Sequence, residues 1–233
     1  MPTNRYPVIA REGWPVLLAI AMIAIVLNNV IGLLAAVPVW ALFGSMVYLF
    51  RDPRRNVPAS PLAVVSPVHG TVIVVDNVRD QWLQREAQHV QIKMSCVEIF
   101  SLRSPIEGKL IKQWSSRFKD DGLVGRDNQQ HAFWIQTDEQ DDVLFAVTAP
   151  GLTSRLRFYV SPGERVGQGQ RCGYLYFGGV VDVLAPVNTR VSINVGDKVI
   201  AGSSVLAQLV HESGVTVLSA VGAAPVNKTL ERI

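Results

Sequence analysis

The sequence is poor in the residues that build disulfide scaffolds and metal centres. It has only two cysteines, Cys96 and Cys172, which lie far apart and outside any CxxC or metal-knuckle pattern. The histidines at 89, 131 and 211 show no metal-ligand spacing. The net charge of +3 is modest, and no nucleic-acid-binding motif accompanies it. We therefore expect free, buried thiols and no nucleic-acid partner.

One long stretch lacks charge altogether. Residues 14–50 contain no Asp, Glu, Lys or Arg, whereas arginines lie on both sides of them. By the positive-inside rule, this pattern predicts a membrane hairpin of one or two helices that turns near 28–32, with both ends in the cytoplasm. Each limb is shorter than the ~20 residues of a full transmembrane helix, so a re-entrant or shallow hairpin stays an alternative. We expect the chain at the inner cell membrane, with its soluble domain on the cytoplasmic side.

Composition divides the rest of the chain. A charged, proline-containing stretch follows the apolar run and cannot be helical throughout. The last residues are polar or small and show no periodic pattern. The expected organisation is an N-terminal segment at 1–13, the membrane hairpin at 14–50, a linker at 51–62, a β-rich domain at 63–210 and a flexible tail at 211–233.

Short apolar runs between Pro and Gly residues predict strands that are joined by hairpins. Outside the membrane hairpin, helix is expected only at 76–88, which is rich in Arg, Gln and Glu, and at 117–124. The expected strands are 64–65, 71–75, 89–94, 109–114, 132–136, 143–147, 155–160 and 180–184.

Two patterns repeat within this domain. The turn sequence Gly-acid-base-Val-x-x-Gly occurs at 163–169 and again at 196–202. The sequence Ser-Pro-x-x-Gly occurs at 66–70 and again at 104–108. The repeats predict two similar units of strand and turn. Such turns serve strand geometry whatever the protein binds, so they indicate the fold and not the function.

Residues 177–183 read Phe-Gly-Gly-Val-Val-Asp-Val, in which adjacent glycines precede a strand-like run. This segment resembles the processing segment of the phosphatidylserine decarboxylases, particularly their short bacterial form. Residues 10–14 and 50–58 resemble the N-terminus and the linker of the same family, so the resemblance extends from the first helix to about Leu209. It implies a mainly β, barrel-sandwich-hybrid-like core with an N-terminal hydrophobic helical hairpin.

The resemblance also implies a self-processing reaction. In this family a serine after the glycine attacks the preceding carbonyl, which splits the chain and leaves a pyruvoyl group on the new N-terminus. Gly179 stands where that serine belongs. Glycine has neither a hydroxyl oxygen to form the ester nor a β-carbon to become the pyruvoyl group, so no Schiff base with a substrate amine can form. We expect no pyruvoyl cofactor in this chain.

Two further family positions are substituted. The resemblance implies an aspartate and a histidine that activate the serine. His69 takes the place of the aspartate within 66–70, and Phe100 takes the place of the histidine within 94–105. Residues that frame each substitution match the family, so we expect a dismantled catalytic set within a retained scaffold. For His69, a packing role is weighed against a pH-sensitive ligand of phosphate or carboxylate.

The first functional hypothesis is a membrane-anchored pseudoenzyme of the phosphatidylserine decarboxylase family. It would bind phospholipid, with head-group contacts from His69, Arg103 and Asp182, or it would scaffold or activate a processing-competent homologue; a homo-oligomer also stays open. The alternative is an active decarboxylase or related lyase with altered chemistry at the same three residues, which a bound carbonyl or cofactor would reveal. A biotinyl- or lipoyl-type carrier fits the turns but lacks a lysine at a suitable hairpin tip.

Overall fold

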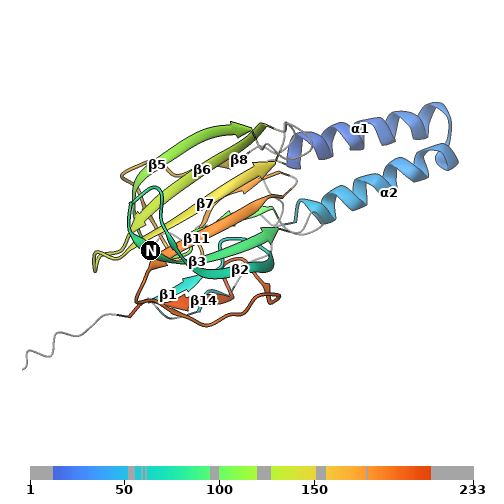
Figure 1. Ribbon diagram of the computed structural model, residues 1–233. Helices are drawn as coiled ribbons and strands as arrows, with labels where there is room; N and C mark the ends of the chain where they lie inside the picture. The colour runs from blue at the N-terminus through green and yellow to red at the C-terminus, as the bar shows by residue number, and fades with distance from the viewer. Residues whose placement is uncertain are drawn as a thin grey trace, which may run out of the picture.

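The computed structural model describes residues 13–51, 56–58, 60, 62–94, 100–119, 127–150, 156–176 and 178–210. Two helices form a hairpin that projects from a β domain, as predicted (Figure 1). Helix α1 (Trp14–Val30) has a proline in its first turn, where no backbone N–H is needed. Helix α2 (Leu33–Leu49) follows after Gly32, which has a φ of +110°.

The hairpin exposes most of its apolar side chains. Ala24 in α1 and Ala36 in α2 are fully buried, and their small size lets the helices approach closely. At the far end, Val30 is 77% exposed and Leu34 is 92% exposed. Each helix has 17 residues. In the described part of the chain, no helix is both long enough and apolar enough to cross a membrane, so the expected transmembrane helix is not found.

The β domain confirms the predicted fold class, because each run predicted as a strand overlaps a strand. The strands are β1 (Ala63–Val65), β2 (Gly70–Arg79), β3 (Glu86–Met94), β4 (Ser101–Arg103), β5 (Gly108–Lys119), β6 (Asp127–Gln136), β7 (Asp142–Pro150), β8 (Leu156–Phe158), β9 (Arg165–Val166), β10 (Arg171–Leu175), β11 (Val180–Pro186), β12 (Arg190–Val191), β13 (Lys198–Val199) and β14 (Val205–Gln208).

These strands form one large sheet and two small ones, all antiparallel. The large sheet has the order β13-β2-β3-β11-β7-β6-β5-β9, and the small sheets have the orders β1-β14-β12 and β4-β10-β8. The order of strands in the large sheet is symmetric about the β11–β7 pair, so that β3 corresponds to β6, β2 to β5 and β13 to β9. We therefore call β1–β3 with β11–β14 the first half, and β4–β10 the second half. The second half lies in the chain between the two parts of the first.

The sequence repeats occupy equivalent places in the two halves, which confirms the predicted repetition. Gly163 and Gly196 both have a φ of +97°, an angle that favours glycine. Their N–H groups donate to Leu110 O at 2.7 Å and to Val72 O at 2.8 Å. Each of these acceptors begins a register shift in its strand, in β5 and in β2. The two halves thus share turns, pairing and irregularities.

Alternation along β11 separates the two faces of the large sheet. Val181 and Val183 are buried in the main core, whereas Asp182 and Leu184 lie on the other face, here called the outer face. A second apolar cluster lies on the outer face, and we call it the outer cluster. It contains Ala87, Ala132, Leu144, Ala146 and Leu184, with Val78, Trp82, Leu83, Trp114 and Trp134 packed against it.

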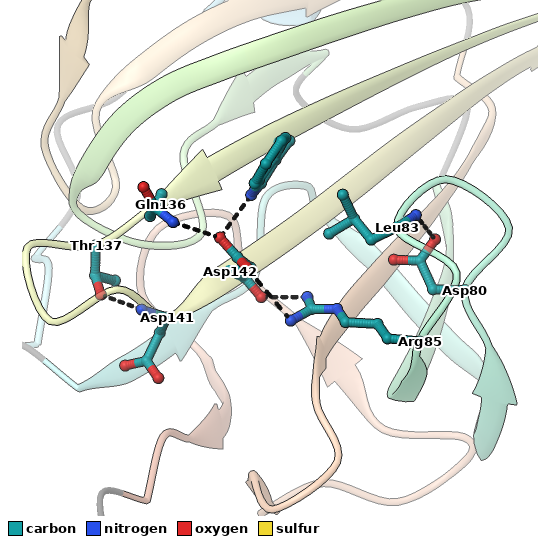
Figure 2. Close-up of polar contacts among 8 residues, drawn as sticks. Asp80, Leu83, Arg85, Gln136, Thr137, Asp141 and Asp142 are labelled. Atoms are coloured by element: carbon teal, nitrogen blue, oxygen red, sulfur yellow. Dashed lines mark hydrogen bonds and ion pairs between the residues drawn. The ribbon is translucent and has the colours of Figure 1, made fainter.

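The helix predicted at 76–88 is wrong, because this segment forms the hairpin of β2 and β3. Asp76 pairs with His89 across the two strands. Asp80 Oδ1 accepts a hydrogen bond from Trp82 N–H at 2.8 Å and one from Leu83 N–H at 3.3 Å, the second of which is drawn in Figure 2. These two bonds fix the turn. Strand pairing and this side-chain cap override the helix propensity of the Arg, Gln and Glu residues.

Other predictions fall partly outside the described residues. Of the helix predicted at 117–124, residues 117–119 belong to β5, so that part is wrong, and 120–124 lie outside. The tail at 211–233 and Cys96 also lie outside. Cys172 is a buried free thiol, as predicted, and it donates a hydrogen bond to Leu102 O at 3.4 Å. Burial raises the pKa of this thiol, which makes it unreactive.

Candidate functional site

Gly179 lies just before β11, where the chain returns to the first half after passing through the whole of the second half. The N–H of Met94, at the end of β3, donates to Gly179 O at 2.9 Å. In the second half, the equivalent bond runs from Thr137 N–H to Asp141 O, also at 2.9 Å. A short turn joins β6 to β7 there, and Figure 2 shows a second bond within it, from Asp141 N–H to Thr137 Oγ1. The Gly179 position is therefore an open version of a hairpin turn that is closed in the second half.

The backbone before Gly179 keeps the conformation of the closed turn. Gly178 has a φ of +77°, and Gln140, which precedes Asp141 in the second half, has a φ of +69°. Left-handed angles of this kind favour glycine over residues with a β-carbon. Gly178 therefore has a backbone role that does not depend on any chemistry at the next residue.

The packing leaves no room for a side chain at Gly179. A β-carbon there would lie 2.4 Å from Thr148 O, a backbone atom of β7, and 3.0 Å from Leu175 Cδ2. A contact of 2.4 Å with a backbone oxygen requires movement of the neighbouring strand. A pyruvoyl group needs carbon and oxygen atoms at this residue, so the residues present do not fit that group.

Phe100 lies in the main core, close to the same position. Its side chain is 3% exposed, and its ring meets Tyr174 edge to face at a centroid distance of 6.0 Å. Phe100 O accepts a hydrogen bond from Leu175 N–H at 2.9 Å, and Leu175 is the residue whose side chain faces Gly179. An apolar ring thus fills the place where the resemblance implies a histidine, and it offers no group for proton transfer.

His69 lies in the turn between β1 and β2 and is 7% exposed. The next residue, Gly70, pairs with Met94, which bonds to Gly179 O. Gly70 is itself constrained, because a β-carbon there would lie 2.2 Å from Lys93 O. These links bring the substituted positions of His69, Phe100 and Gly179 to one end of β3.

Arg103 lies beside this end of the domain and is buried. Its N–H donates to Pro67 O at 2.9 Å, which ties β4 to the turn that holds His69. Its Nη1 donates to Gly169 O at 3.0 Å. Arg103 is thus engaged with the backbone of the repeat turn, and its role as a head-group contact stays a prediction.

Asp182 does not join the three substituted positions. It lies on the outer face, where its Oδ1 accepts hydrogen bonds from His89 Nε2 at 2.9 Å and from Gln91 Nε2 at 2.6 Å. His89 Nδ1 lies 2.8 Å from Asp76 Oδ1. We call Asp76, His89, Gln91 and Asp182 the polar network. It connects β2, β3 and β11, and a head-group role for Asp182 stays a prediction.

The polar network favours a protonated His89. Both ring nitrogens face carboxylate oxygens, which only accept hydrogen bonds when ionised, so both nitrogens must donate. Burial alone would lower the pKa of His89, but the hydrogen bonds and charges of Asp182 and Asp76 outweigh burial and raise this pKa above its usual value. By contrast, burial lowers the pKa of His131 on β6, which keeps that imidazole neutral near pH 7.

The site offers little for a metal ion. Within the ranges described here, no group of three or more His, Cys, Asp or Glu side chains could hold one. The side chain that faces Gly179 most closely is the apolar Leu175, whose N–H donates to Phe100 O. Among the described residues at this end, the three substituted positions hold an imidazole, an apolar ring and a glycine, which do not form a serine, histidine and aspartate set.

Comparison with known proteins decides the family. Residues 42–207 match the family described as phosphatidylserine decarboxylase. The phosphatidylserine decarboxylase proenzyme of Nitrosomonas europaea is 37% identical over 211 residues, which cover 89% of this chain and 98% of that protein. The chain belongs to the phosphatidylserine decarboxylase family. The proenzymes of Nitrosomonas eutropha and Aromatoleum aromaticum are 36% and 35% identical, each over 89% of this chain. No solved structure matches the chain.

Membership of the phosphatidylserine decarboxylase family confirms the resemblance found in the sequence. Sequence reasoning did not find Thr148 and Leu175, which close the space beside Gly179. Neither residue lies in a family motif. Thr148 comes close to Gly179 because it pairs with the next residue, Val180, and Leu175 does so because it ends β10. The sequence also assigned no role to His89, because the residues that bond to its side chain come together only when the sheet forms.

Proposed function

We propose that this chain is a non-self-processing member of the phosphatidylserine decarboxylase family, a pseudoenzyme that binds phospholipid at a membrane surface. One observation carries the proposal. Gly179 lacks the atoms from which a pyruvoyl group is made, and Thr148 O closes the space that a side chain would need. Without a carbonyl electron sink, decarboxylation of an amino acid is prohibitively slow.

The helical hairpin supports the membrane part of the proposal. Its residues 14–50 are uncharged, and apolar side chains are exposed along both helices. An exposed apolar surface of this extent is typical of contact with a membrane or another protein. At the exit, the Arg51 guanidinium lies 3.9 Å from the ring centre of Tyr48, a pairing suited to the lipid head-group region. We place the hairpin as a shallow or re-entrant anchor in the inner membrane, with the β domain on the cytoplasmic side.

Phospholipid binding would use the end of the domain that carries the three substituted positions. The main core reaches the hairpin there, because Phe50 at the end of α2 stacks on Tyr174 at 6.4 Å and Tyr174 contacts Phe100. The buried His69 and Arg103 supply the polar groups of this end. These contacts favour a head-group site close to the membrane surface.

A direct test measures membrane binding and carbonyl chemistry of the same purified full chain. We expect it to bind vesicles that contain phosphatidylserine and to remain unlabelled by a carbonyl-reactive probe. Val30→Glu, at the end of α1, should weaken vesicle binding at least tenfold, because a charge in the bilayer costs about 2.5–3.5 kcal/mol. The matched control is Val187→Glu, which follows β11 at the opposite end of the large sheet and whose side chain is also exposed, at 54%.

The outcomes separate the competing functions. Equal vesicle binding by the two glutamate variants would remove the hairpin anchor. Carbonyl labelling of the native chain would favour the alternative, an active decarboxylase or related lyase with altered chemistry. A partner role, in which the chain scaffolds a processing-competent homologue of the kind named proenzyme among its relatives, requires that the two proteins copurify. Failure to bind vesicles together with failure to copurify would remove both proposed roles.

A further inference from the structure

The hairpin of α1 and α2 carries apolar side chains on both of its broad faces. Ala24 is fully buried, which shows that this side of α1 faces α2. Ile23 and Ile25 lie about 100° to either side of Ala24, because successive residues of an α-helix are about 100° apart. Each of these two side chains is 51% exposed. The two isoleucines therefore point out of opposite broad faces of the hairpin.

Polar side chains do not gather on one face of the hairpin, all of which the structure describes. In α2, the exposed Val37 and Leu42 lie on opposite sides of the buried Ala36. In α1, Asn28 and Asn29 lie in the last turn, at the far end of the hairpin. A helix that lies in the plane of the head groups needs a polar face toward water. A hairpin that lay flat on a membrane would therefore leave one apolar face in water.

Packing at the base fixes the direction of the hairpin. Phe50, at the end of α2, is buried and stacks on Tyr174 of the main core. Gly13, just before α1, lies against the same ring, since a β-carbon there would be 2.6 Å from Phe50 Cγ. Met46 and Leu49 also pack against the main core. These contacts hold the hairpin so that it extends away from the β domain (Figure 1).

The far end of the hairpin has polar backbone groups that need hydration. The N–H groups of Ile31 and Gly32 donate to Leu27 O at 2.9 and 3.2 Å. The first N–H groups of α2 have no partner inside the helix, and no side chain among the described residues caps its start. Polar backbone groups of this kind avoid the middle of the hydrocarbon. The far end therefore favours a position close to lipid head groups.

The length of the helices allows an upright hairpin to meet this requirement. Each helix has 17 residues and is about 25 Å long, whereas the hydrocarbon of a bilayer is about 30 Å thick. An upright hairpin with its base at the near head groups ends about 5 Å short of the opposite ones. The side-chain amides of Asn28 and Asn29 at this end can span much of that gap.

We propose that the hairpin enters the bilayer end-on, with acyl chains against both broad faces, and returns to the side from which it came. Tyr48 and Arg51, which pair at the base, then lie at the near head groups. Acyl chains carry no charge, so the hairpin itself does not distinguish anionic from neutral lipids. This inference rests on the proposed membrane binding, and of the two forms named there, shallow and re-entrant, it selects the re-entrant one.

Electron paramagnetic resonance of spin labels on the full chain tests this placement, on vesicles of phosphatidylcholine. Ile23→Cys and Ile25→Cys, each combined with Cys96→Ser, form a matched pair because the two sites are equally exposed on opposite faces. The native Cys172 is buried and unreactive, so it stays unlabelled. We expect both labels to lose access to a water-soluble nickel complex and to remain accessible to oxygen, which dissolves in hydrocarbon. A label at Val187→Cys, on the β domain, should keep its access to nickel.

Labels nearer the ends of α1 sharpen the test. Oxygen is most concentrated at the centre of a bilayer. An upright hairpin should therefore give the highest oxygen access at the two isoleucine sites and lower access at Leu18→Cys and Val30→Cys. A flat hairpin would give similar oxygen access at Leu18 and Ile25, because these residues share one face of α1.

The contrary results have distinct meanings. Nickel access at one isoleucine site and not at the other would show a flat hairpin, which overturns this inference and leaves membrane binding standing. Labels shielded from both nickel and oxygen would show that protein covers the hairpin, which also overturns it. Sedimentation only with vesicles that contain phosphatidylserine would show that head-group contacts hold the chain, with the same consequence. If the chain sediments with neither kind of vesicle, the proposed membrane binding itself fails.

Discussion

The two halves of the large sheet differ at equivalent places on the outer face. In the first half, Asp76 pairs with His89 and Gln91 pairs with Asp182, and these residues form the polar network. In the second half, the equivalent pairs are Trp114 with Ala132 and Trp134 with Leu144, which belong to or pack against the outer cluster. At these equivalent positions, the same backbone arrangement thus carries polar side chains in the first half and apolar or aromatic ones in the second.

Chain connectivity accounts for this difference. In the second half, a short turn joins β6 to β7, so their pairing is local. In the first half, β3 and β11 are separated by the whole of the second half, and no turn holds them together. The polar network joins these distant segments through hydrogen bonds to His89 and Gln91. We infer that the side chains of the polar network hold β3 and β11 together, as the backbone of the turn holds β6 and β7 together.

Breaking the polar network should have the largest effect on stability. Asp182→Ala removes the acceptor of both His89 Nε2 and Gln91 Nε2 and leaves a charged imidazole without that partner. We expect the free energy of unfolding to fall by about 2–4 kcal/mol. Urea denaturation of the purified chain measures it. Asp138→Ala removes an exposed carboxylate of the second half that pairs with Arg165, and it should lower the midpoint much less because that ion pair is exposed to solvent. Equal midpoints for the two variants would contradict this role.

A side chain at the open turn should have the next largest effect. Gly179→Ala and Gly179→Ser both place a β-carbon against Thr148 O, so each should lower the free energy of unfolding by about 1–3 kcal/mol. The alanine variant is the control, because it adds the β-carbon without the hydroxyl. If alanine proves as stable as glycine in the same denaturation experiment, the space beside Gly179 is open and our reading of the packing is wrong.

The protonation of His89 should give a smaller, pH-dependent effect. Its pKa is higher in the folded chain than its usual value of 6.5, so the folded protein binds this proton more tightly. This stabilisation is fully present below about pH 6.5 and is lost as the pH rises through the folded pKa. Its size should be below about 1 kcal/mol, because solvent reaches Asp76 and part of His89.

Denaturation midpoints between pH 5.5 and 9, compared for the native chain and His89→Asn, measure this effect. The native chain should lose stability across this range, and the variant should lose less. A native curve that rises with pH in step with the variant would show that His89 is not held as a cation.

The turn of the second half should give the smallest effect. Gln140 holds a φ of +69° with a β-carbon, whereas its equivalent Gly178 does so without one. Gln140→Gly should relieve this strain, and the greater freedom of glycine in the unfolded chain should offset part of the gain. We expect a net change of no more than about 1 kcal/mol, in the stabilising direction. A clear loss of stability would mean that the two turns are not equivalent.

The sequence predicted the strands well and the site only in part. Apolar runs between Pro and Gly identified the strands because those residues punctuate hairpins wherever they pack. The helix prediction for 76–88 was wrong because polar residues that face solvent suit a hairpin as well as a helix. Asp80 caps the turn of this hairpin, and an aspartate at that place in the sequence is equally typical of a helix N-terminus. The substitutions at His69, Phe100 and Gly179 were found from the family motifs.

What the sequence could not predict depends on long-range pairing. Thr148 approaches Gly179 because β11 pairs with β7 in one register, and no local pattern encodes that distance. The partners of His89 come from β2 and β11, which are far apart in the chain. Expectations for membrane placement, lipid and protein partners, and the chain beyond Val210 stay predictions.

Intact-mass spectrometry shows whether this chain cuts itself before Gly179. The native protein and Gly179→Ser are purified in parallel and treated with a carbonyl-reactive probe. We expect a single unbroken native chain of 25.5 kDa that takes up no probe. We also expect an uncut serine variant, because the space beside residue 179 is closed and His69 and Phe100 replace the activating pair. Two native fragments divided after Gly178, or a native chain that carries a carbonyl adduct, would contradict the first of these expectations.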